Sequence, residues 1–386
     1  MKKMLPILLA LVLLFSMVPV SAATPITIVS DGMIVETDVA PVIEMGTTLV
    51  PVRFISEALG AIIKYDPVTK NVTISSAANT VVIKIGSKTA TVNGVAKTMS
   101  QAPTGLNGRT MVPMRFISEQ LGAVVSYGSN TVQVKYFTNT KGTIKAGGSS
   151  TVAPIAQAAA DELMKLSDDV NISYASSGSG NGIKGAIDGS FHVGGSSREL
   201  TEAEKTANPT LVVYPIAIDG IAVIVHKDNI VKALTKDQVE SIFTGETKNW
   251  KDLGGENAPI FVQTRESTSG TLASFKELAL GNADVVATAT PFATNGLLKE
   301  AVAGNKNAIG FVSMGYVDST VRALSVNGVM PNNFTFLNKT YPILRTIDVI
   351  TKGKATGAAA LYIDFIRSPL IQQIAEKEGY LSVIEK

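Results

Sequence analysis

Three Ser/Gly-rich segments in the 386-residue chain, at residues 147–151, 176–182 and 265–271, combine small side chains with hydroxyl groups. Each lies between an apolar stretch and the start of a predicted helix. A helix N-terminus leaves backbone N–H groups without partners and has about half a positive charge. Glycine lets such backbone approach a ligand closely, and Ser or Thr hydroxyls add short donors. Together, three of these termini would bind a small oxyanion without many lysines.

Two arginines near these segments, Arg198 and Arg265, could add planar guanidinium groups that bind oxygen atoms in pairs. Any one Ser/Gly segment alone is more typical of a flexible linker or an ordinary helix cap than of an anion site. Three such segments at strand-to-helix junctions, one of them with the pattern R-x-x-x-S-G-T, favour an anion-binding site.

The amino-acid composition excludes several further classes of function and of binding site. Lys plus Arg total 34 and Asp plus Glu total 32, a formal charge of +2 that gives no bulk electrostatic reason to expect nucleic acid binding. Apolar residues make up 45% and charged residues 17%, so the chain can bury large cores. There is no cysteine and there are only two histidines, His192 and His226. We therefore expect no disulfide, no metal site, no cofactor and no lipid anchor on a cysteine.

A catalytic role is not expected either. A serine nucleophile needs a base within hydrogen-bonding distance, and His192 is the only histidine near the Ser/Gly segments. The sequence has neither a cluster of Asp, Glu and His metal ligands nor a G-x-x-x-x-G-K-[ST] nucleotide loop. These absences favour a binding protein over an enzyme.

Residues 1–23 have the pattern of a secretory signal peptide. Lys2 and Lys3 come first, an apolar run follows, and small residues then offer a cleavage site. An uncleaved membrane anchor is the alternative, but the apolar run is short for a membrane span. We expect an exported, extracytoplasmic protein that is associated with the cell surface or cell wall and is not a lipoprotein.

An internal repeat marks the next domain, residues 24–136. The sequence TLVPVRFISEALGA at 48–61 recurs as TMVPMRFISEQLGA at 110–123, so that Pro51 corresponds to Pro113, 62 residues later. In each copy the proline precedes a predicted helix that ends at a glycine, and alternating strands follow. Arg53 and Arg115 could bind a ligand. We favour the simpler interpretation that each pairs with the glutamate four residues later, Glu57 or Glu119.

This repeat region resembles the copper amine oxidase-like N-terminal, or stalk, domain. The resemblance implies a small α+β domain, which we interpret as a spacer or adhesion module that faces the cell wall. No copper is expected, because residues 24–136 contain no histidine or cysteine. After a polar linker at 137–142, predicted strands at 143–146 and 170–174 alternate with a helix at 153–166. This alternation predicts an α/β domain over residues 143–386.

The α/β domain resembles the phosphate-binding protein of the phosphate ABC transporter. The matching residues are GGSSTVAP at 147–154, YASSGSGNGI at 174–183, VGGSSREL at 193–200 and RESTSGTLASF at 265–275. The resemblance implies a two-lobed, hinged periplasmic-binding-protein fold of type II. Lobe one would comprise residues 143–221 and 345–386, and lobe two would comprise residues 222–344, so the chain would cross twice.

The same resemblance implies which residues bind the anion. They come from both lobes, so the ligand would favour the closed state. The implied donors of lobe one are Ser150, Thr151, Ser179, Ser197 and Arg198, and those of lobe two are Arg265, Ser269, Gly270 and Thr271.

Three positions depart from the family pattern. Ser197 replaces an aspartate that in some relatives accepts the proton of hydrogen phosphate, so another acceptor is required. Asp219 is the candidate, and the alternative is that it forms a turn before Gly220. His192 replaces a common aspartate, and we expect a partly buried substitution without ligand contact. Leu272 replaces a common arginine, which removes one positive charge.

These observations predict an exported substrate-binding protein that captures inorganic phosphate and delivers it to an ABC transporter permease. Cell-wall polymers are a further expected partner, through the N-terminal domain, and no nucleic acid partner is expected. The alternatives are a structural or adhesive wall protein with a vestigial binding lobe, or a binder of another tetrahedral oxyanion such as sulfate or tungstate.

Overall fold

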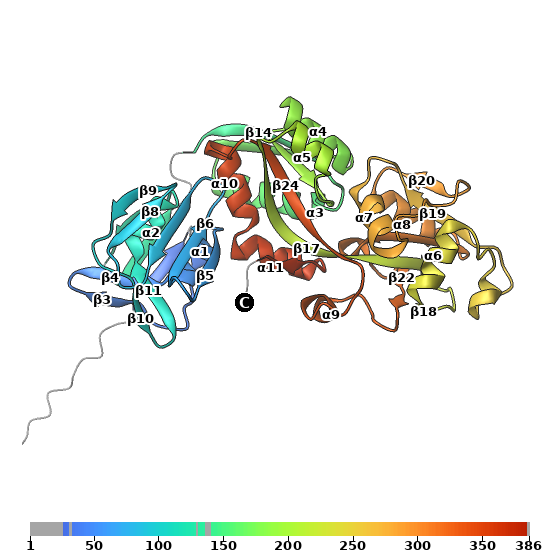
Figure 1. The fold of residues 1–386 in the computed structure, drawn as a ribbon, viewed down its shortest axis with the longest axis horizontal. Coiled ribbons are helices and arrows are strands. Elements are labelled where there is room, and N and C mark those ends of the chain that lie inside the picture. The colour runs from blue at the N-terminus through green and yellow to red at the C-terminus, as the bar shows by residue number, and fades with distance from the viewer. Residues whose placement is uncertain (1–25, 31–32, 129, 136–139, 384–386) are drawn as a thin grey trace, which may run out of the picture.

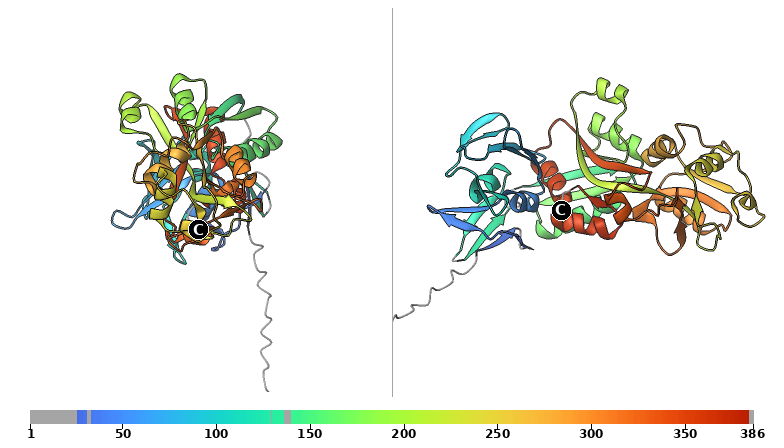
Figure 2. Two further views of the ribbon diagram at one scale, coloured as in Figure 1. Left: turned by 90° about the vertical axis from the view of Figure 1, so that its right-hand side faces the viewer. Right: turned by 60° about the horizontal axis from the view of Figure 1, so that its bottom comes forward.

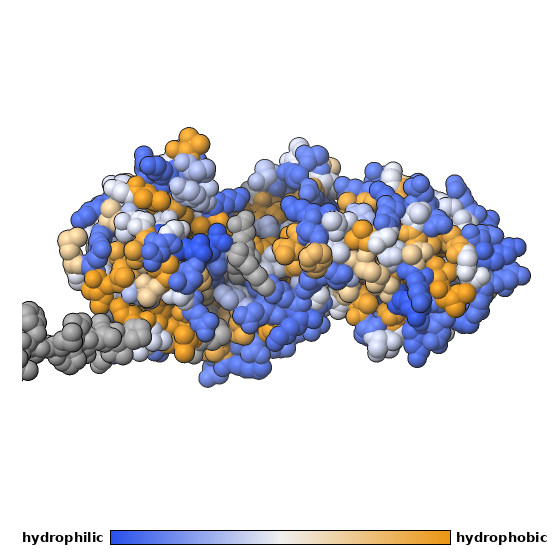
Figure 3. Space-filling model, turned by 90° about the horizontal axis from the view of Figure 1, so that it is seen from below, coloured by the Kyte–Doolittle hydropathy of each residue, from blue (hydrophilic) through white to orange (hydrophobic). Residues whose placement is uncertain are grey.

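The computed structural model describes residues 26–30, 33–128, 130–135 and 140–383, so the predicted signal peptide and half of the predicted linker, residues 137–139, lie outside the described residues. Figure 1 shows three bodies in a row: an N-terminal domain and two lobes joined by two long strands. The N-terminal domain lies beside one lobe, at the end of the molecule opposite the other lobe (Figure 2). Apolar side chains gather on its underside, whereas the far end of lobe two is mostly hydrophilic (Figure 3). In the described ranges, no helix has the length and apolar character needed to cross a membrane.

The N-terminal domain consists mostly of short strands. In chain order its elements are β1 (Thr27–Ser30), β2 (Met33–Ile34), β3 (Val42–Glu44), β4 (Thr47–Pro51), α1 (Val52–Ala58), β5 (Ile62–Asp66), β6 (Asn71–Ser75), β7 (Thr80–Lys84), β8 (Thr89–Val92), β9 (Val95–Thr98), β10 (Thr104–Leu106), β11 (Arg109–Pro113), α2 (Met114–Gln120), β12 (Val124–Tyr127) and β13 (Thr131–Lys135). Within the described residues they form the sheets β12-β13-β1-β2, β10-β11-β4-β3 and β5-β6-β7-β8-β9.

The two repeats fold alike. Helices α1 and α2 each begin directly after the predicted proline, because proline has no N–H that would be left unpaired there. Apolar residues at helical spacing, such as Ile55 and Ile117, are fully buried in one shared core. The predicted pairs are confirmed, with Arg53 Nε 4.0 Å from Glu57 and Arg115 Nη1 3.8 Å from Glu119.

The second domain alternates strands and helices over most of its length. Its elements are β14 (Gly142–Gly148), α3 (Ala153–Leu166), β15 (Val170–Ser176), α4 (Ser179–Asp188), β16 (Val193–Ser196), α5 (Glu202–Ala207), β17 (Leu211–His226), β18 (Ala233–Leu234), α6 (Lys236–Thr244), the 3-10 helix η1 (Trp250–Leu253), β19 (Phe261–Arg265), α7 (Gly270–Ala279), β20 (Thr290–Phe292), α8 (Asn295–Ala303), β21 (Ala308–Ser313), the 3-10 helix η2 (Met314–Tyr316), β22 (Val321–Ala323), β23 (Ser325–Val326), α9 (Asn333–Leu337), β24 (Leu344–Lys352), α10 (Gly357–Ile366), α11 (Pro369–Lys377) and β25 (Leu381–Ser382).

Two long strands, β17 and β24, join the lobes. The main sheet has the order β15-β14-β16-β24-β17-β21-β19-β20. It is parallel at both ends, where β14 pairs with β15 and β16 and where β19 pairs with β20 and β21, and antiparallel around β17 and β24. Strand β17 pairs with β24 up to Gly220 and with β21 from Ile221 onward. This arrangement confirms the α/β class and the two-lobed binding-protein fold.

The N-terminal domain is docked on lobe one through backbone contacts. Ala77, between β6 and β7, is buried in the core of lobe one. Its N–H donates to Asp364 Oδ1 at 2.6 Å, and its carbonyl accepts from the Tyr214 hydroxyl at 3.4 Å. A methyl group added at Gly60 would lie 1.8 Å from the carbonyl oxygen of Asp364. The close approach of these two backbones therefore requires glycine at position 60.

Gly60→Ala should undock the N-terminal domain. Gly60 has a φ of +70°, and the new methyl group would overlap the Asp364 carbonyl, so the two bodies must separate. Small-angle X-ray scattering of the full chain should then show a larger radius of gyration. Gly86→Ala is the matched control, because Gly86 also has a left-handed φ, +83°, but has open space beside it. Equal radii for the two variants would contradict this docking.

Candidate functional site

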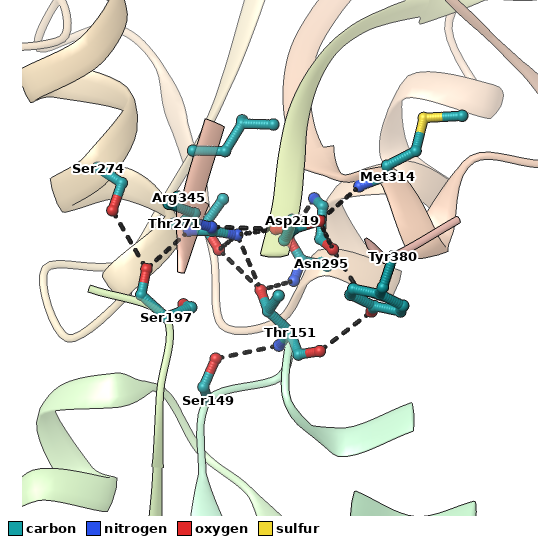
Figure 4. A network of polar contacts seen from close by, with 12 residues as sticks. Ser149, Thr151, Ser197, Asp219, Thr271, Ser274, Asn295, Met314, Arg345 and Tyr380 are labelled. Atoms are coloured by element: carbon teal, nitrogen blue, oxygen red, sulfur yellow. Dashed lines mark hydrogen bonds and ion pairs between the residues drawn. The ribbon is translucent and has the colours of Figure 1, made fainter. Parts of the chain in front are cut away.

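Four helix N-termini meet between the lobes. Helices α3 and α4 come from lobe one, and α7 and α8 come from lobe two. The Thr151 and Thr271 hydroxyls, at the starts of α3 and α7, lie 3.1 Å apart. Asn295, the first residue of α8, donates from Nδ2 to the Ser150 hydroxyl at 3.2 Å and to the Thr151 hydroxyl at 3.0 Å. The predicted convergence of helix termini is thus present, with α8 as a fourth member, and Figure 4 shows Thr151, Thr271 and Asn295 close together.

Glycines allow the loops of the two lobes to touch. A Cβ at Gly270, the first residue of α7, would lie 2.3 Å from the hydroxyl of Ser179 on the opposite lobe. The Ser179 hydroxyl in turn accepts from the backbone N–H of Ser197 at 3.0 Å. Within lobe one, a Cβ at Gly148 would lie 2.4 Å from the carbonyl oxygen of Gly195. The Ser/Gly composition of these segments therefore follows from close backbone packing as well as from donor chemistry.

A buried ion pair lies on the two strands that join the lobes. Asp219 on β17 is directly opposite Arg345 on β24. Arg345 donates to Asp219 Oδ2 from Nη2 at 2.7 Å and from Nε at 3.0 Å. The two side chains are 4% and 0% exposed, so water screens this interaction very little.

Arg345 also donates hydrogen bonds to residues of both lobes. Its Nη2 donates to the hydroxyls of Thr151 in lobe one and Thr271 in lobe two, each at 3.1 Å. Its Nη1 donates to the Ser197 carbonyl at 3.1 Å. One guanidinium at the crossing strands therefore connects the anion-loop residues of the two halves.

Arg265 is a second buried guanidinium in the same cluster. It is 2% exposed, and it donates to Asn295 Oδ1 at 3.0 Å and to the Ser150 hydroxyl at 3.3 Å. Its other acceptors are backbone carbonyls, those of Phe292 and Ala293. Among the described residues, no carboxylate forms an ion pair with it. Burial, and then the nearby charge of Arg345, lower the pKa of Arg265 to about 10.

The cluster therefore has excess positive charge. Two guanidinium groups are buried there, and Asp219 is the carboxylate that pairs with one of them. Burying a charge without a counter-charge is costly, and an anion bound among these donors would offset that cost. In the described part of the chain, no three His, Asp or Glu side chains gather into a metal-binding group. The chemistry of the site is that of an anion receptor.

Asp219 accepts more hydrogen bonds than the sequence suggested. Its Oδ1 accepts from the Ser313 hydroxyl at 2.7 Å and from the Met314 N–H at 3.2 Å, in addition to the two bonds from Arg345 to Oδ2. Burial raises the pKa of Asp219, and the charge of Arg345 opposes this shift. The turn alternative for Asp219 is wrong, because Asp219 lies inside the continuous strand β17.

Three further residues that were singled out in the sequence have roles of their own in the structure. The hydroxyl of Ser269 accepts from the Leu272 N–H at 3.2 Å and so caps α7. Arg198 is not in the cluster: it forms a two-pronged pair with Glu204, both bonds at 2.8 Å, which lowers the pKa of Glu204 to about 2. His192 is exposed, and its Nδ1 accepts from a backbone N–H. The expectation that His192 is partly buried was wrong, because the loop before β16 turns it outward.

Several residues of the cluster were not predicted from the sequence. Arg345 and Asn295 were not expected there, nor was the Tyr316 hydroxyl, which donates to the Ser150 carbonyl at 2.6 Å. The Tyr380 hydroxyl donates to the Thr151 carbonyl at 3.0 Å. The one available signal was a charged residue within an apolar strand, as for Arg345 in the segment ILRTIDVI.

The fold and this site define a two-lobed solute-binding protein with an anion receptor between its lobes. Residues 137–369 match the family described as the PBP superfamily domain, and residues 29–136 match the copper amine oxidase N-terminal domain. The chain is 34% identical to the phosphate-binding protein PstS of Bacillus subtilis over 259 residues, which are 67% of this chain and 86% of the relative. The chain therefore belongs to the phosphate-binding protein family within the PBP superfamily.

Solved structures agree with this assignment. A putative phosphate ABC transporter substrate-binding protein with bound phosphate, from Clostridium perfringens, is 38% identical with a TM-score of 0.61, and the match covers 63% of this chain and 100% of that one. An ABC-type phosphate transport receptor from Vibrio cholerae is 31% identical with a TM-score of 0.53, and the match covers 62% and 99% of the two chains. Both matches leave more than a third of this chain uncovered.

Asp348, also on β24, is a buried carboxyl close to the site. It is paired in register with Ser196, the residue before Ser197. Burial is the main cause that raises the pKa of Asp348 to about 7; the charge of Glu199 adds to the shift and that of Arg367 opposes it. Folding therefore favours the protonated form of Asp348.

Asp348→Asn should remove a pH dependence of stability. A carboxyl with a raised folded-state pKa contributes stability below its unfolded pKa and loses it as the pH rises through the folded pKa. Between about pH 4 and pH 7 the wild type should lose up to about 4 kcal/mol of unfolding free energy relative to the variant. Urea denaturation at pH 4.5 and pH 8 measures this difference. Asp188→Asn should give the opposite sign, because a hydrogen bond from Ser190 lowers the pKa of Asp188. A pH-independent difference for Asp348→Asn would refute the prediction.

Proposed function

We propose that this protein captures inorganic phosphate between its lobes and delivers it to an ABC importer, without a catalytic step. The single observation that carries the proposal is the pair of buried guanidinium groups, Arg265 and Arg345, with one carboxylate between two lobes. A small tetrahedral anion would supply the missing negative charge. The named function of the Bacillus subtilis relative, and the bound phosphate in the Clostridium perfringens structure, support phosphate as that anion.

The donors proposed to bind phosphate belong to both lobes. They are Ser150, Thr151, Ser179 and Ser197 in lobe one and Arg265, Ser269, Gly270 and Thr271 in lobe two, with Arg345 and Asn295 added by the structure. In the structure, groups of the two lobes bond directly to one another. An anion would exchange the bonds between neutral groups, such as that between Thr151 and Thr271, for charge-assisted ones, which are roughly twice as strong. The gain exists only when the lobes are together, so the ligand favours closure.

We further propose that the protein is exported and acts at the cell surface. The signal-like residues 1–23 and the domain order support this proposal. In it, lobe one and the docked N-terminal domain form the fixed part, lobe two moves, and a permease receives the closed form. The N-terminal domain would contact cell-wall polymers. The intact charge cluster favours transport over a purely adhesive role with a vestigial lobe.

Arg265→Ala should weaken phosphate binding strongly. The guanidinium supplies buried positive charge, so its loss should cost about 2–5 kcal/mol of binding free energy. Isothermal titration calorimetry on phosphate-free protein measures the dissociation constant. Arg265→Lys should recover only part of the affinity, because an ammonium cannot reproduce the paired bonds to Asn295 and Ser150.

Arg198→Ala is the matched control for Arg265→Ala. Arg198 was predicted from the same family pattern, but it is paired with Glu204 outside the cluster. Its removal should leave the phosphate dissociation constant within about twofold, since it makes no bond to the anion loops of lobe two. If the two arginine variants weakened binding equally, the cluster would not be the phosphate site.

Asp219→Asn tests how the anion is selected. All four acceptor directions of Asp219 are already engaged, so we propose that it acts on the ligand by holding Arg345. Phosphate and sulfate affinities should then fall together, with their ratio changed less than about twofold. Competition calorimetry with both anions measures that ratio. A selective loss of phosphate affinity would instead assign Asp219 as the acceptor of the phosphate proton.

A further inference from the structure

The N-terminal domain has an internal two-fold symmetry. Val50 on β4 pairs antiparallel with Val112 on β11, which is its own equivalent in the second repeat. Antiparallel strands that pair at equivalent residues are related by a two-fold axis through that pair. The hairpins β3–β4 and β10–β11, and the helices α1 and α2, follow the same relation.

Two surface pockets lie at equivalent places in this domain. In each, one repeat provides a proline, an arginine and a tyrosine, and the hairpin of the other repeat provides a glycine and a threonine. The first pocket, about 340 Å³, is lined by Pro51, Arg53, Tyr65, Gly108 and Thr110. The second, about 480 Å³, is lined by Pro113, Arg115, Tyr127, Gly46 and Thr48. Each residue is 62 positions from its counterpart, the same offset as between Pro51 and Pro113.

The shared side chains are not explained by core packing. Tyr65 is 54% exposed and Tyr127 is 46% exposed. The two pockets also differ at their rims. Arg109 lines the first pocket, whereas Thr47 occupies the equivalent position in the second. A tyrosine and a partly exposed arginine that occur in both copies, although neighbouring rim positions differ, indicate a surface function.

The chemistry of each pocket suits an anionic group on a hydroxyl-rich chain. The Arg53 and Arg115 side chains are 38% and 55% exposed, and the carboxylates of Glu57 and Glu119 lie 4.0 and 3.8 Å away, near the limit of an ion pair. The Arg115 guanidinium lies 4.9 Å from the centre of the Tyr127 ring. A guanidinium binds carboxylate or phosphate oxygens, and a tyrosine ring packs against the C–H face of a sugar or polyol.

We infer that the two pockets are duplicated binding sites for a hydroxyl-rich polyanion, either a carboxylated glycan or a polyol phosphate. This inference rests on the proposed role of the N-terminal domain at the cell surface. A polymer with an anionic group in every repeat can occupy both pockets, and its second contact is then intramolecular. A neutral glycan would form no charge-assisted hydrogen bond with either guanidinium group, so it should bind far more weakly.

Calorimetry on the full chain tests the inference directly. The probes are oligogalacturonate, a carboxylated glycan, and poly(glycerol phosphate), with neutral dextran for comparison and inorganic phosphate present throughout to occupy the cleft. At least one polyanion should bind saturably, and dextran should not. Arg53→Gln or Arg115→Gln should each weaken binding by about tenfold or more, because bivalent contact is lost, and the double variant should show no measurable heat. Tyr65→Ala with Tyr127→Ala should act in the same direction.

The controls separate this inference from the functions proposed above. Lys88→Gln removes an exposed positive charge outside both pockets and should change nothing. A far-ultraviolet circular dichroism spectrum and a urea unfolding transition that match those of the wild type show that each variant is folded. Absence of saturable binding by both polyanions, or equal weakening by Lys88→Gln, would overturn the inference. If the double variant cosedimented with isolated cell walls as well as the wild type did, the pockets would be excluded while the surface role stood. If the wild type did not cosediment, the surface role itself would fail.

Discussion

The ion pair between Asp219 and Arg345 is the interaction on which the site depends. It joins the two crossing strands at the point where β17 changes partner from β24 to β21. Asp219 fixes the guanidinium, and the guanidinium then bonds to a threonine from each lobe. The geometry of the hinge and that of the anion receptor are therefore set by one buried contact. Such a pair is costly to desolvate, and a functional requirement explains its presence better than stability does.

Excess positive charge between the lobes explains why an anionic ligand would favour the closed form of the protein. Arg265 is buried against neutral acceptors, which stabilise its charge only in part. The anion would complete the charge balance, and only the closed form brings all the donors together. The N-terminal domain does not enter this cycle, because its contacts at Ala77 and Gly60 are with lobe one. It can hold one lobe while the other moves.

Much of the fold could be predicted from the sequence. The repeat predicted two similar units with helices that follow Pro51 and Pro113, and periodicity gave helix α3 with its observed bounds. The Ser/Gly segments located three of the four helix termini. Prediction failed for His192, whose exposure depends on the direction of a loop. The sequence also did not indicate that Arg198 pairs with Glu204 away from the cluster.

The sequence by itself determined the classes of residue at the site, because helix caps, glycine approach and hydroxyl donors depend on local backbone chemistry. It also determined the repeat, and with it the equivalence of the two pockets. Only the tertiary structure decided that Arg345 and Asn295 join the site, since they are 194 and 144 residues from Thr151 in the chain. Strand register and helix packing bring such residues together, and neither is encoded in the spacing of a local motif.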